Sequence, residues 1–268
     1  MTTVIWTAAA GAVVVYITGA FLFALWRRDN SVADVAWGPG FMVAGAAALA
    51  AGPGPTPRAW LVMALVAVWA LRLAVHIGSR RRGQGEDFRY ARWRERWGRR
   101  WVVRSFLQVF LVQGAILLVV ALPVLLVVGA PATPLGVLDA LGTVLWLAGI
   151  LWESVADAQL ARFRRDPAHH GRLLTAGLWR YSRHPNYFGE ALLWWGVGVI
   201  ALAVPGGWLG MLGPAVLTFL LVRVSGVPML ERGHLEHRPG YGEYVASTNA
   251  FVPWPPRKAG VMEAGGRS

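Results

Sequence analysis

Apolar runs of 16 to 25 residues recur along this chain and are separated by short polar segments. About 20 apolar residues in a helix cross the hydrocarbon core of a bilayer, so this pattern is typical of a polytopic membrane protein. The first run has neither a basic start nor a small-residue cleavage site, and we predict that it is kept as a span. The sequence thus predicts an all-α fold with seven transmembrane helices, at residues 3–26, 34–51, 59–77, 105–129, 136–160, 189–204 and 208–227.

Basic residues mark one side of the predicted bundle. Arginines follow the first, third, fifth and seventh runs, whereas the other loops carry a single basic residue, Arg58. Cytoplasmic loops of membrane proteins are enriched in Lys and Arg. We therefore predict that the N-terminus lies outside and the C-terminus in the cytoplasm, which requires an odd number of spans.

The composition agrees with a membrane location and excludes several classes of catalytic and metal site. The 268 residues are 56% hydrophobic and 15% charged, with a net charge of +12 that topology and lipid contact explain without a nucleic-acid partner. The lack of cysteine excludes disulfides, thiol nucleophiles, thiolate zinc sites and Cys-ligated iron–sulfur clusters. We predict one integral membrane domain over residues 1–256 and a disordered tail over 257–268.

Tryptophans recur every four residues among arginines in the segment 89–104 (RYARWRERWGRRWVVR). On a helix, Trp93, Trp97 and Trp101 would form one stripe flanked by cations. Such a stripe could bind nucleic acid, or it could belong to an interfacial helix at anionic headgroups. Membrane spans on both sides of the segment favour the interfacial helix and membrane lipids as partners.

Acidic and basic residues share a face at the end of the fifth run. If the helix continues past residue 160, spacings of four and seven place Glu153, Asp157 and Arg164 together. Burying acidic side chains near the end of an apolar helix costs free energy unless they are paired with a cation or hydrated. They could bind a ligand's ribose or amide groups with Arg164 on a phosphate, or they could form an internal ion-pair network.

The most polar segment near a span is 180–190 (RYSRHPNYFGE), which precedes the sixth run. Pro185 suits the first turn of a helix, and Asn186 and Glu190 would then share a face. A helix start favours phosphate, and three arginines lie nearby. Glu190 could accept hydrogen bonds from a ligand, or it could belong to an Arg–Glu clamp. The arginines are Arg172, Arg180 and Arg183.

The stretch after the last run carries His234, His237, Tyr241 and Tyr244 close to Glu231. The tyrosines could stack on an adenine, close a cavity or anchor the chain at the interface. The two histidines could ligate a metal, but no further ligand completes a site, so we predict none. There is also no phosphate loop and no GxGxxG turn between a strand and a helix.

One acid lies at the start of the second run. Asp34 could cap its helix or pair with Arg27 or Arg28. It could instead face a substrate cavity and deliver a proton.

Four motifs together resemble the DUF1295 group of the steroid 5α-reductase superfamily. They are DAQL from Asp157, GLWRYSRHPNYFGE over 177–190, WWG from Trp194, and VSGVPMLE over 224–231. The segment also resembles the Arg-His-x-Asn-Tyr-x-Gly-Asp run of sterol C14- and C7-reductases. The resemblance covers most of the chain and is strongest from about 145 to 254, and it implies a cofactor half at about 137–254.

The resemblance implies a seven-helix reductase that uses NADPH. Such enzymes transfer hydride to the β-carbon of an enone in a lipophilic substrate, such as a 3-oxo-Δ4 steroid, and an acid protonates the product. We predict a location in the bacterial inner membrane with the site open to the cytoplasm, because the polar loops lie on the side that the arginines mark. The oligomeric state stays open, and a monomer is compatible with the sequence. By position, the cofactor contacts are Asp157, Arg164, Arg172, Arg183, His184, Asn186, Tyr187, Glu190, Glu231 and Tyr241.

The first half of the chain differs from the steroid 5α-reductases. Those enzymes place a Gln-Glu pair in the second span, where this chain has Asp34-Val35-Ala36-Trp37. We therefore expect the proton to come from Asp34 or Tyr187.

Another enzyme class shares part of the pattern. Isoprenylcysteine carboxyl methyltransferases, which use S-adenosylmethionine, have Arg-His-Pro-x-Tyr and Tyr-x-x-Tyr segments. Tyr241 and Tyr244 keep the second spacing, whereas Gly189-Glu190 matches the reductases. A non-enzymatic lipid-binding or scaffold protein would leave Arg164, Asn186 and Glu190 without a purpose, so we favour the reductase.

Overall fold

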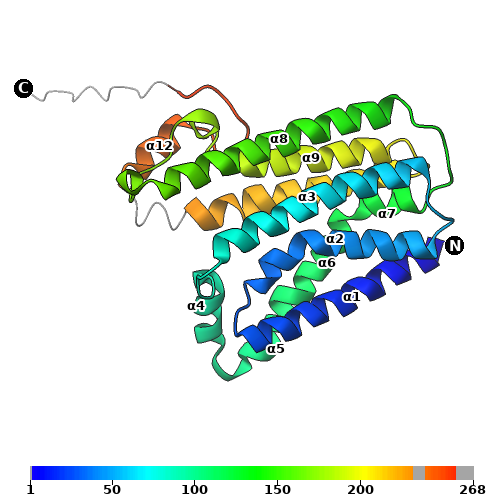
Figure 1. Ribbon diagram of the computed structural model, residues 1–268, viewed down its shortest axis with the longest axis horizontal. Coiled ribbons are helices and arrows are strands. Elements are labelled where there is room, and N and C mark those ends of the chain that lie inside the picture. The colour runs from blue at the N-terminus through cyan, green and yellow to red at the C-terminus, as the bar shows by residue number, and fades with distance from the viewer. Residues whose placement is uncertain (1, 232–238, 258–268) are drawn as a thin grey trace, which may run out of the picture. The chain divides into compact units, whose positions relative to one another are not determined.

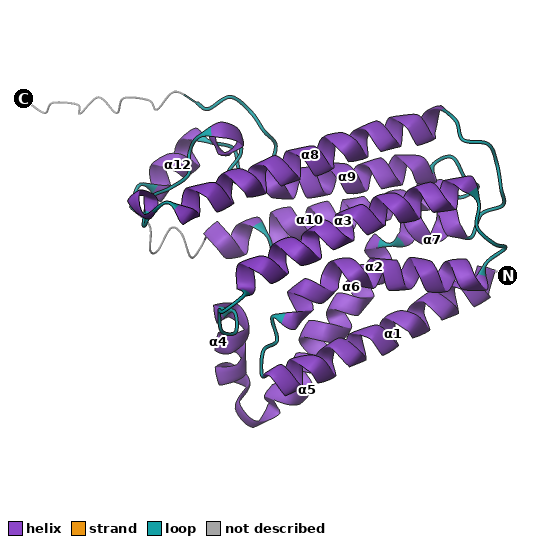
Figure 2. Ribbon diagram, viewed as in Figure 1, coloured by secondary structure: helices purple, strands orange, loops and turns teal. Residues whose placement is uncertain are grey.

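A computed structural model describes residues 2–231 and 239–257. The fold is all-helical, with 78% of residues in helices and no strand in the described ranges (Figure 2). The prediction of an all-α fold is therefore confirmed.

Six helical stretches of the described chain are long and apolar enough to cross a membrane. The remaining predicted span, 189–204, falls on α9, Pro185–Ala201, whose 17 residues extend about 25 Å. That length is less than the roughly 30 Å of a typical hydrocarbon core, and the count of seven and the orientation stay predictions. The six are α1 Thr2–Arg27, α2 Val32–Ala51, α3 Pro57–Arg81, the stretch Phe88–Val120, α8 Val137–Arg165 and the stretch Gly207–Glu231.

The stretch Phe88–Val120 is not one straight helix. Gly98 ends the first helix of the stretch with a φ of 49°, a left-handed value that glycine adopts without strain. Figure 1 shows that first helix, α4, running at a steep angle to α1, α2 and α3. The parts are α4 Phe88–Trp97, η1 Gly98–Arg100, α5 Trp101–Ser105, the π-helical η2 Phe106–Leu111 and α6 Val112–Val120, and α7 Leu122–Val128 follows.

The chain folds as two compact units. The first unit contains residues up to Val144 and Trp195–Val216, and the second contains Leu145–Trp194 and the residues from Leu217 onward. The helices α8 and α9 each contribute to both units. The second unit also contains the short helices η3 Pro167–His169 and η4 Gly177–Arg180, the π-helical η6 Leu220–Val224, and α12 Tyr241–Ser247.

A buried ion pair joins the starts of α3 and α8 in the first unit. Arg58 donates from Nε to Oδ1 of Asp139 at 2.7 Å and from Nη2 to Oδ2 at 2.9 Å. Its guanidinium also donates to the Thr133 hydroxyl and to the Pro134 carbonyl at 2.8 Å. The only basic residue of the predicted outer loops is thus a structural one, because two bonds to a carboxylate fix its plane.

The tryptophan stripe of α4 packs partly against protein. Trp93 and Trp97 stack at 5.7 Å and lie against a core cluster of the first unit that includes Phe21 and Phe110. The arginines of the other face are exposed, namely Arg92, Arg96, Arg99 and Arg100. The predicted aromatic stripe therefore contributes to the core, while its cations face outward.

Two glycines let α8 and α9 approach closely in the second unit. A Cβ atom on Gly149 would lie 2.5 Å from the Leu193 nitrogen, and one on Gly189 would lie 2.6 Å from the Glu153 nitrogen. No side chain fits at such distances, so the two backbones are nearly in contact. The crossing fixes which residues of the two helices face each other.

Candidate functional site

The polar residues of the second unit gather where α8 and α9 cross. The helix α8 continues to Arg165, as the shared face of Glu153, Asp157 and Arg164 requires. Near the Glu153–Gly189 contact, one turn along each helix, Asn186 donates from Nδ2 to Oδ1 of Asp157 at 3.3 Å. The crossing therefore brings together the acid of the DAQL motif and the asparagine of the 177–190 motif.

Three carboxylates are buried near this crossing. Glu153 is 3% exposed, and Asp157 and Glu190 are each 8% exposed. Burying a carboxylate in an apolar environment is costly, and such groups mark functional sites more often than structural ones in membrane helices. Glu153 belongs to the face predicted from spacing, although the resemblance did not single it out.

The start of α9 agrees with the prediction from Pro185. Proline occupies the first helical position, where a missing N–H group costs no hydrogen bond. The first turn carries Asn186, and Glu190 lies one turn further along. A helix start with an amide and a carboxylate can bind the hydroxyl, amide or phosphate groups of a ligand.

A clamp built on Arg183 ties the start of α9 to the C-terminal segment. Arg183 donates from Nε to Oε1 of Glu231 at 2.7 Å and from Nη1 to the carbonyl oxygens of Val245, at 3.1 Å, and Thr248. Its backbone N–H donates to the Asn249 carbonyl at 2.9 Å. Arg183 thus engages protein groups, and its carboxylate partner is Glu231.

His184 and Tyr187 lie beside this clamp. Nε2 of His184 is 3.3 Å from Oε1 of Glu231, and the imidazole stacks on the Tyr187 ring at 5.5 Å with 6° between planes. The structure therefore brings four of the predicted residues together: Arg183, His184, Tyr187 and Glu231.

The two C-terminal tyrosines are buried in the second unit. Tyr241 packs edge-on against Tyr244 at 6.0 Å, and the Tyr244 hydroxyl donates to the carbonyl oxygens of Trp179 and, at 3.4 Å, Ser182. Burial raises the pKa of Tyr244, and the nearby Tyr241 and Glu231 raise it further. The hydroxyl therefore stays protonated and holds α12 against the chain before α9.

Two predicted phosphate contacts lie at the surface. Arg164 is exposed in the last turn of α8, and Arg172 is exposed in the segment that follows. They are thus accessible to an anionic ligand, unlike Arg183. His234 and His237 lie outside the described residues, and within the described ranges no three His, Asp or Glu residues gather as metal ligands.

Asp34 belongs to a separate polar cluster in the first unit. Oδ2 of Asp34 accepts from Nη2 of Arg89 at 2.7 Å, and Oδ1 accepts from the Tyr90 hydroxyl at 2.6 Å. These partners come from the start of α4, and Arg27 and Arg28 do not pair with Asp34. Sequence reasoning missed Arg89 and Tyr90, because it treated the segment only as a tryptophan stripe.

The arginine of this cluster is itself held in place by a second acid. Asp87 caps α4 by accepting from the Arg89 backbone at 3.0 Å and from its Nε at 2.9 Å. Burial alone would raise the pKa of Asp87, but the hydrogen bonds from Arg89 and the charges of Arg89 and Arg81 hold it below its usual range. Asp34, Asp87, Arg89 and Tyr90 therefore form one oriented group.

Comparison with known proteins identifies one family. The sequence profile of a family described as "Protein of unknown function (DUF1295)" matches residues 20–248, which include both polar clusters. No curated protein and no solved structure matched this chain.

Proposed function

Because this chain belongs to the DUF1295 family, whose motifs resemble the steroid 5α-reductase superfamily, we propose that it is a membrane-embedded, NADPH-dependent reductase. Its substrate is a lipophilic molecule with a carbon–carbon double bond next to a carbonyl, such as a 3-oxo-Δ4 steroid or another enone. We further propose a bacterial inner-membrane location with the site open to the cytoplasm.

One observation carries the proposal: a buried acid and a half-buried amide meet at the start of α9. Asp157 and Asn186 lie 3.3 Å apart, with Glu190 buried one turn beyond. A dinucleotide presents ribose hydroxyls and a carboxamide, which need carboxylate and amide partners, and phosphates, which need cations. The set of side chains supplies both, because Arg164 and Arg172 are exposed beyond the buried acids.

The residues divide into binding and supporting roles. In this proposal Asp157, Asn186 and Glu190 bind the neutral polar groups of the cofactor, and Arg164 and Arg172 bind its phosphates. Arg183 and Glu231 hold the C-terminal segment in place. His184, Tyr187 and Tyr241 supply the aromatic wall of the site.

The reaction needs a hydride and a proton. Bound NADPH would supply the hydride to the β-carbon of the enone, and the electron pair of the double bond would move toward the carbonyl oxygen. Tyr187 carries a hydroxyl stacked beside His184 and would donate the proton to the α-carbon or the oxygen. Asp34 accepts hydrogen bonds at both oxygens, from Arg89 and from the Tyr90 hydroxyl, so its proposed part is to hold these two side chains in place.

The proposal is tested by binding first and by turnover second. Purified protein should bind NADPH in a fluorescence titration and should not bind S-adenosylmethionine. Binding of S-adenosylmethionine without NADPH would overturn the reductase in favour of a methyltransferase. A mass-spectrometric screen of lipids incubated with enzyme and NADPH should then find a substrate that gains two hydrogens.

A further inference from the structure

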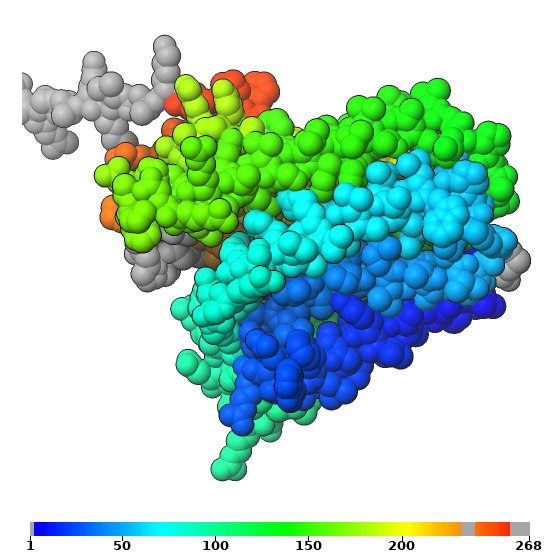
Figure 3. Space-filling view, in the orientation of Figure 1, coloured from blue at the N-terminus to red at the C-terminus, as the bar shows by residue number. Residues whose placement is uncertain are grey.

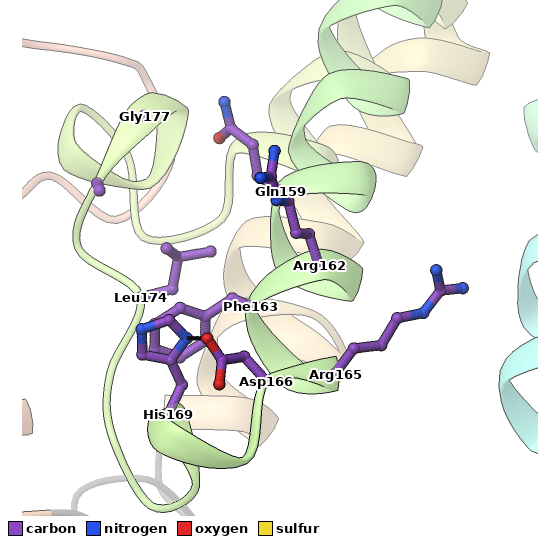
Figure 4. A pocket seen from close by; sticks show the side chains of 9 residues that line it. Gln159, Arg162, Phe163, Arg165, Asp166, His169, Leu174 and Gly177 are labelled. Atoms are coloured by element: carbon purple, nitrogen blue, oxygen red, sulfur yellow. Dashed lines mark ion pairs between the residues drawn. The ribbon is translucent and has the colours of Figure 1, made fainter.

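An open pocket of about 620 Å³ lies at the C-terminal end of α8 (Figure 4). Its volume is in the range of sites that bind small molecules or parts of larger ones. All its lining residues belong to the second unit and to 159–177, and none of them was predicted to bind the cofactor. They are Gln159, Arg162, Phe163, Arg165, Asp166, His169, Leu174, Ala176 and Gly177.

The floor of the pocket is aromatic and already ordered. The rings of Phe163 and His169 stack at 4.3 Å with 9° between planes, and Leu174 lies beside them. The Asp166 carboxylate accepts from the Ala168 backbone at 2.9 Å and lies 3.5 Å from Nδ1 of His169. The one acid of the pocket is therefore engaged by protein groups.

The rim carries cations that the fold does not use. Within the described residues, no hydrogen bond or ion pair engages the guanidinium of Arg162 or Arg165. Figure 4 shows Arg162 beside Gln159 at the pocket, whereas the Arg165 guanidinium extends away from the other side chains. A guanidinium presents several N–H donors in one plane and binds phosphate oxygens through two of them. The pocket therefore has the chemistry of a phosphate site above an apolar floor.

An exposed apolar stripe leads along α8 to this pocket. Leu151, Val155, Gln159 and Arg162 follow at spacings of four, four and three, so they share one face of the helix. Leu151 is 63% exposed and Val155 is 46% exposed, and both lie in a helix long and apolar enough to cross a membrane. Their exposed side chains can therefore contact lipid. Figure 3 shows side chains of α8 at the molecular surface along this helix. About 10 Å of helix separates Val155 from Arg162, a distance that one lipid covers.

This face is not the one that carries the proposed cofactor residues. Glu153 and Asp157 are buried, whereas Leu151 and Val155 between and beside them are exposed. The two faces thus point in different directions from the same helix. A ligand in the pocket would leave the Asp157–Asn186 pair untouched.

We propose that this pocket binds the phosphate headgroup of an anionic membrane phospholipid, whose acyl chain lies along Leu151 and Val155. Arg162 contacts the phosphate, and the Phe163–His169 stack supports the glycerol backbone. The apolar stripe selects a lipid over a soluble phosphate ester, because only a lipid covers it. This site is independent of the proposed reductase activity.

The test uses the full chain in detergent after lipid removal. Native mass spectrometry should show saturable binding of palmitoyl-oleoyl phosphatidylglycerol, and glycerol 3-phosphate, which lacks the chains, should bind far more weakly. Arg162→Gln should lower the affinity for phosphatidylglycerol about five-fold, equivalent to about 1 kcal/mol per basic residue near an anionic lipid. Arg82→Gln removes the same charge from an exposed position after α3 and should leave this binding step unchanged.

A second variant fills the pocket without changing its charge. Leu174→Trp should lower the affinity by a similar factor, while melting curves like those of the parent protein verify the fold. Parent-like affinity in both Arg162→Gln and Leu174→Trp would overturn the proposal, because the lipid would then bind elsewhere. Equally tight binding of glycerol 3-phosphate would overturn it too and would define a site for soluble phosphate esters.

Discussion

Glu190 is a buried carboxylate beside the α8–α9 crossing. In the proposed site its carboxylate accepts hydrogen bonds from the cofactor. Removing a buried charge-assisted hydrogen bond costs about 1.5–3 kcal/mol, which corresponds to a loss of roughly 10- to 150-fold in affinity.

We therefore predict that Glu190→Ala weakens NADPH binding at least ten-fold while the protein still folds. Fluorescence titration measures the dissociation constant, and thermal melting checks the fold. Glu243→Ala is the matched control, because Glu243 is exposed on α12. An unchanged dissociation constant in Glu190→Ala would make this glutamate structural.

Asp34 permits a second test at the scale of one residue. Asp34→Asn keeps the shape of the side chain but removes the charge opposite Arg89 and alters the acceptor of the Tyr90 hydroxyl. We predict that turnover falls at least 100-fold and that NADPH affinity stays at the parent value.

Asp29→Asn is the control for Asp34, because Asp29 lies in the preceding turn, 4.0 Å from Arg81. That variant should retain parent turnover. Normal turnover in Asp34→Asn, measured as NADPH consumption with a lipid substrate, would remove Asp34 from the mechanism.

At the scale of elements, sequence patterns located helices better than they located contacts. The runs 3–26 and 34–51 correspond to α1 and α2 within two residues, because apolar length alone sets them. The run 105–129 instead contains η2, α6 and α7, since a π-helical turn and a break at Ala121 follow from packing and not from hydropathy. Close approach at Gly149 and Gly189 was likewise not predictable, because glycine spacing alone names no partner helix.

The glycine crossing makes a strong prediction about packing. Gly149→Ala would place a methyl group 2.5 Å from the Leu193 nitrogen, so we expect a loss of about 1–3 kcal/mol or more in the free energy of unfolding. Gly19→Ala in α1 has open space and should be neutral or stabilising by about 0.5–1 kcal/mol. Thermal unfolding in detergent compares the two, and equal melting temperatures would contradict the close approach of α8 and α9.

The Asp87 cap makes the stability of α4 depend on pH in the acid range. The folded-state pKa of Asp87 lies below its unfolded value of about 3.9, so its contribution is complete above that value and is lost as pH falls through the folded pKa. Asp87→Asn keeps a cap acceptor but removes the charge that faces Arg89 and Arg81, so it should lower stability near pH 7 by up to about 1 kcal/mol and should flatten the decline below pH 4. Melting curves between pH 2.5 and 7 measure both effects, and parallel acid declines in parent and variant would exclude Asp87 as a source.

At the scale of the whole molecule, sequence and structure agree on a helical membrane protein of the DUF1295 family. The resemblance named residues 157 and 186 as parts of one site, and the structure places the two side chains 3.3 Å apart. The pairing of Asp34 with Arg89 was not predicted from the sequence, because 55 residues separate them and no periodicity links such distant positions. Side of the membrane and number of spans remain predictions from the arginine pattern.

The absence of cysteine makes orientation directly testable. Ala132→Cys lies in an exposed loop predicted to be outside, and Ala168→Cys lies in an exposed segment predicted to be inside. In right-side-out vesicles, a membrane-impermeant maleimide should label Ala132→Cys at once and Ala168→Cys only after detergent is added. The opposite order would invert the predicted topology.

The buried Arg58–Asp139 pair has a consequence for biosynthesis. The two partners are separated by 81 residues, so Arg58 leaves the ribosome well before its carboxylate exists. At a synthesis rate of about 5–20 residues per second, the delay is on the order of 4–16 s. During that interval the guanidinium must stay hydrated at the membrane surface, and α3 can reach its final depth only when α8 arrives.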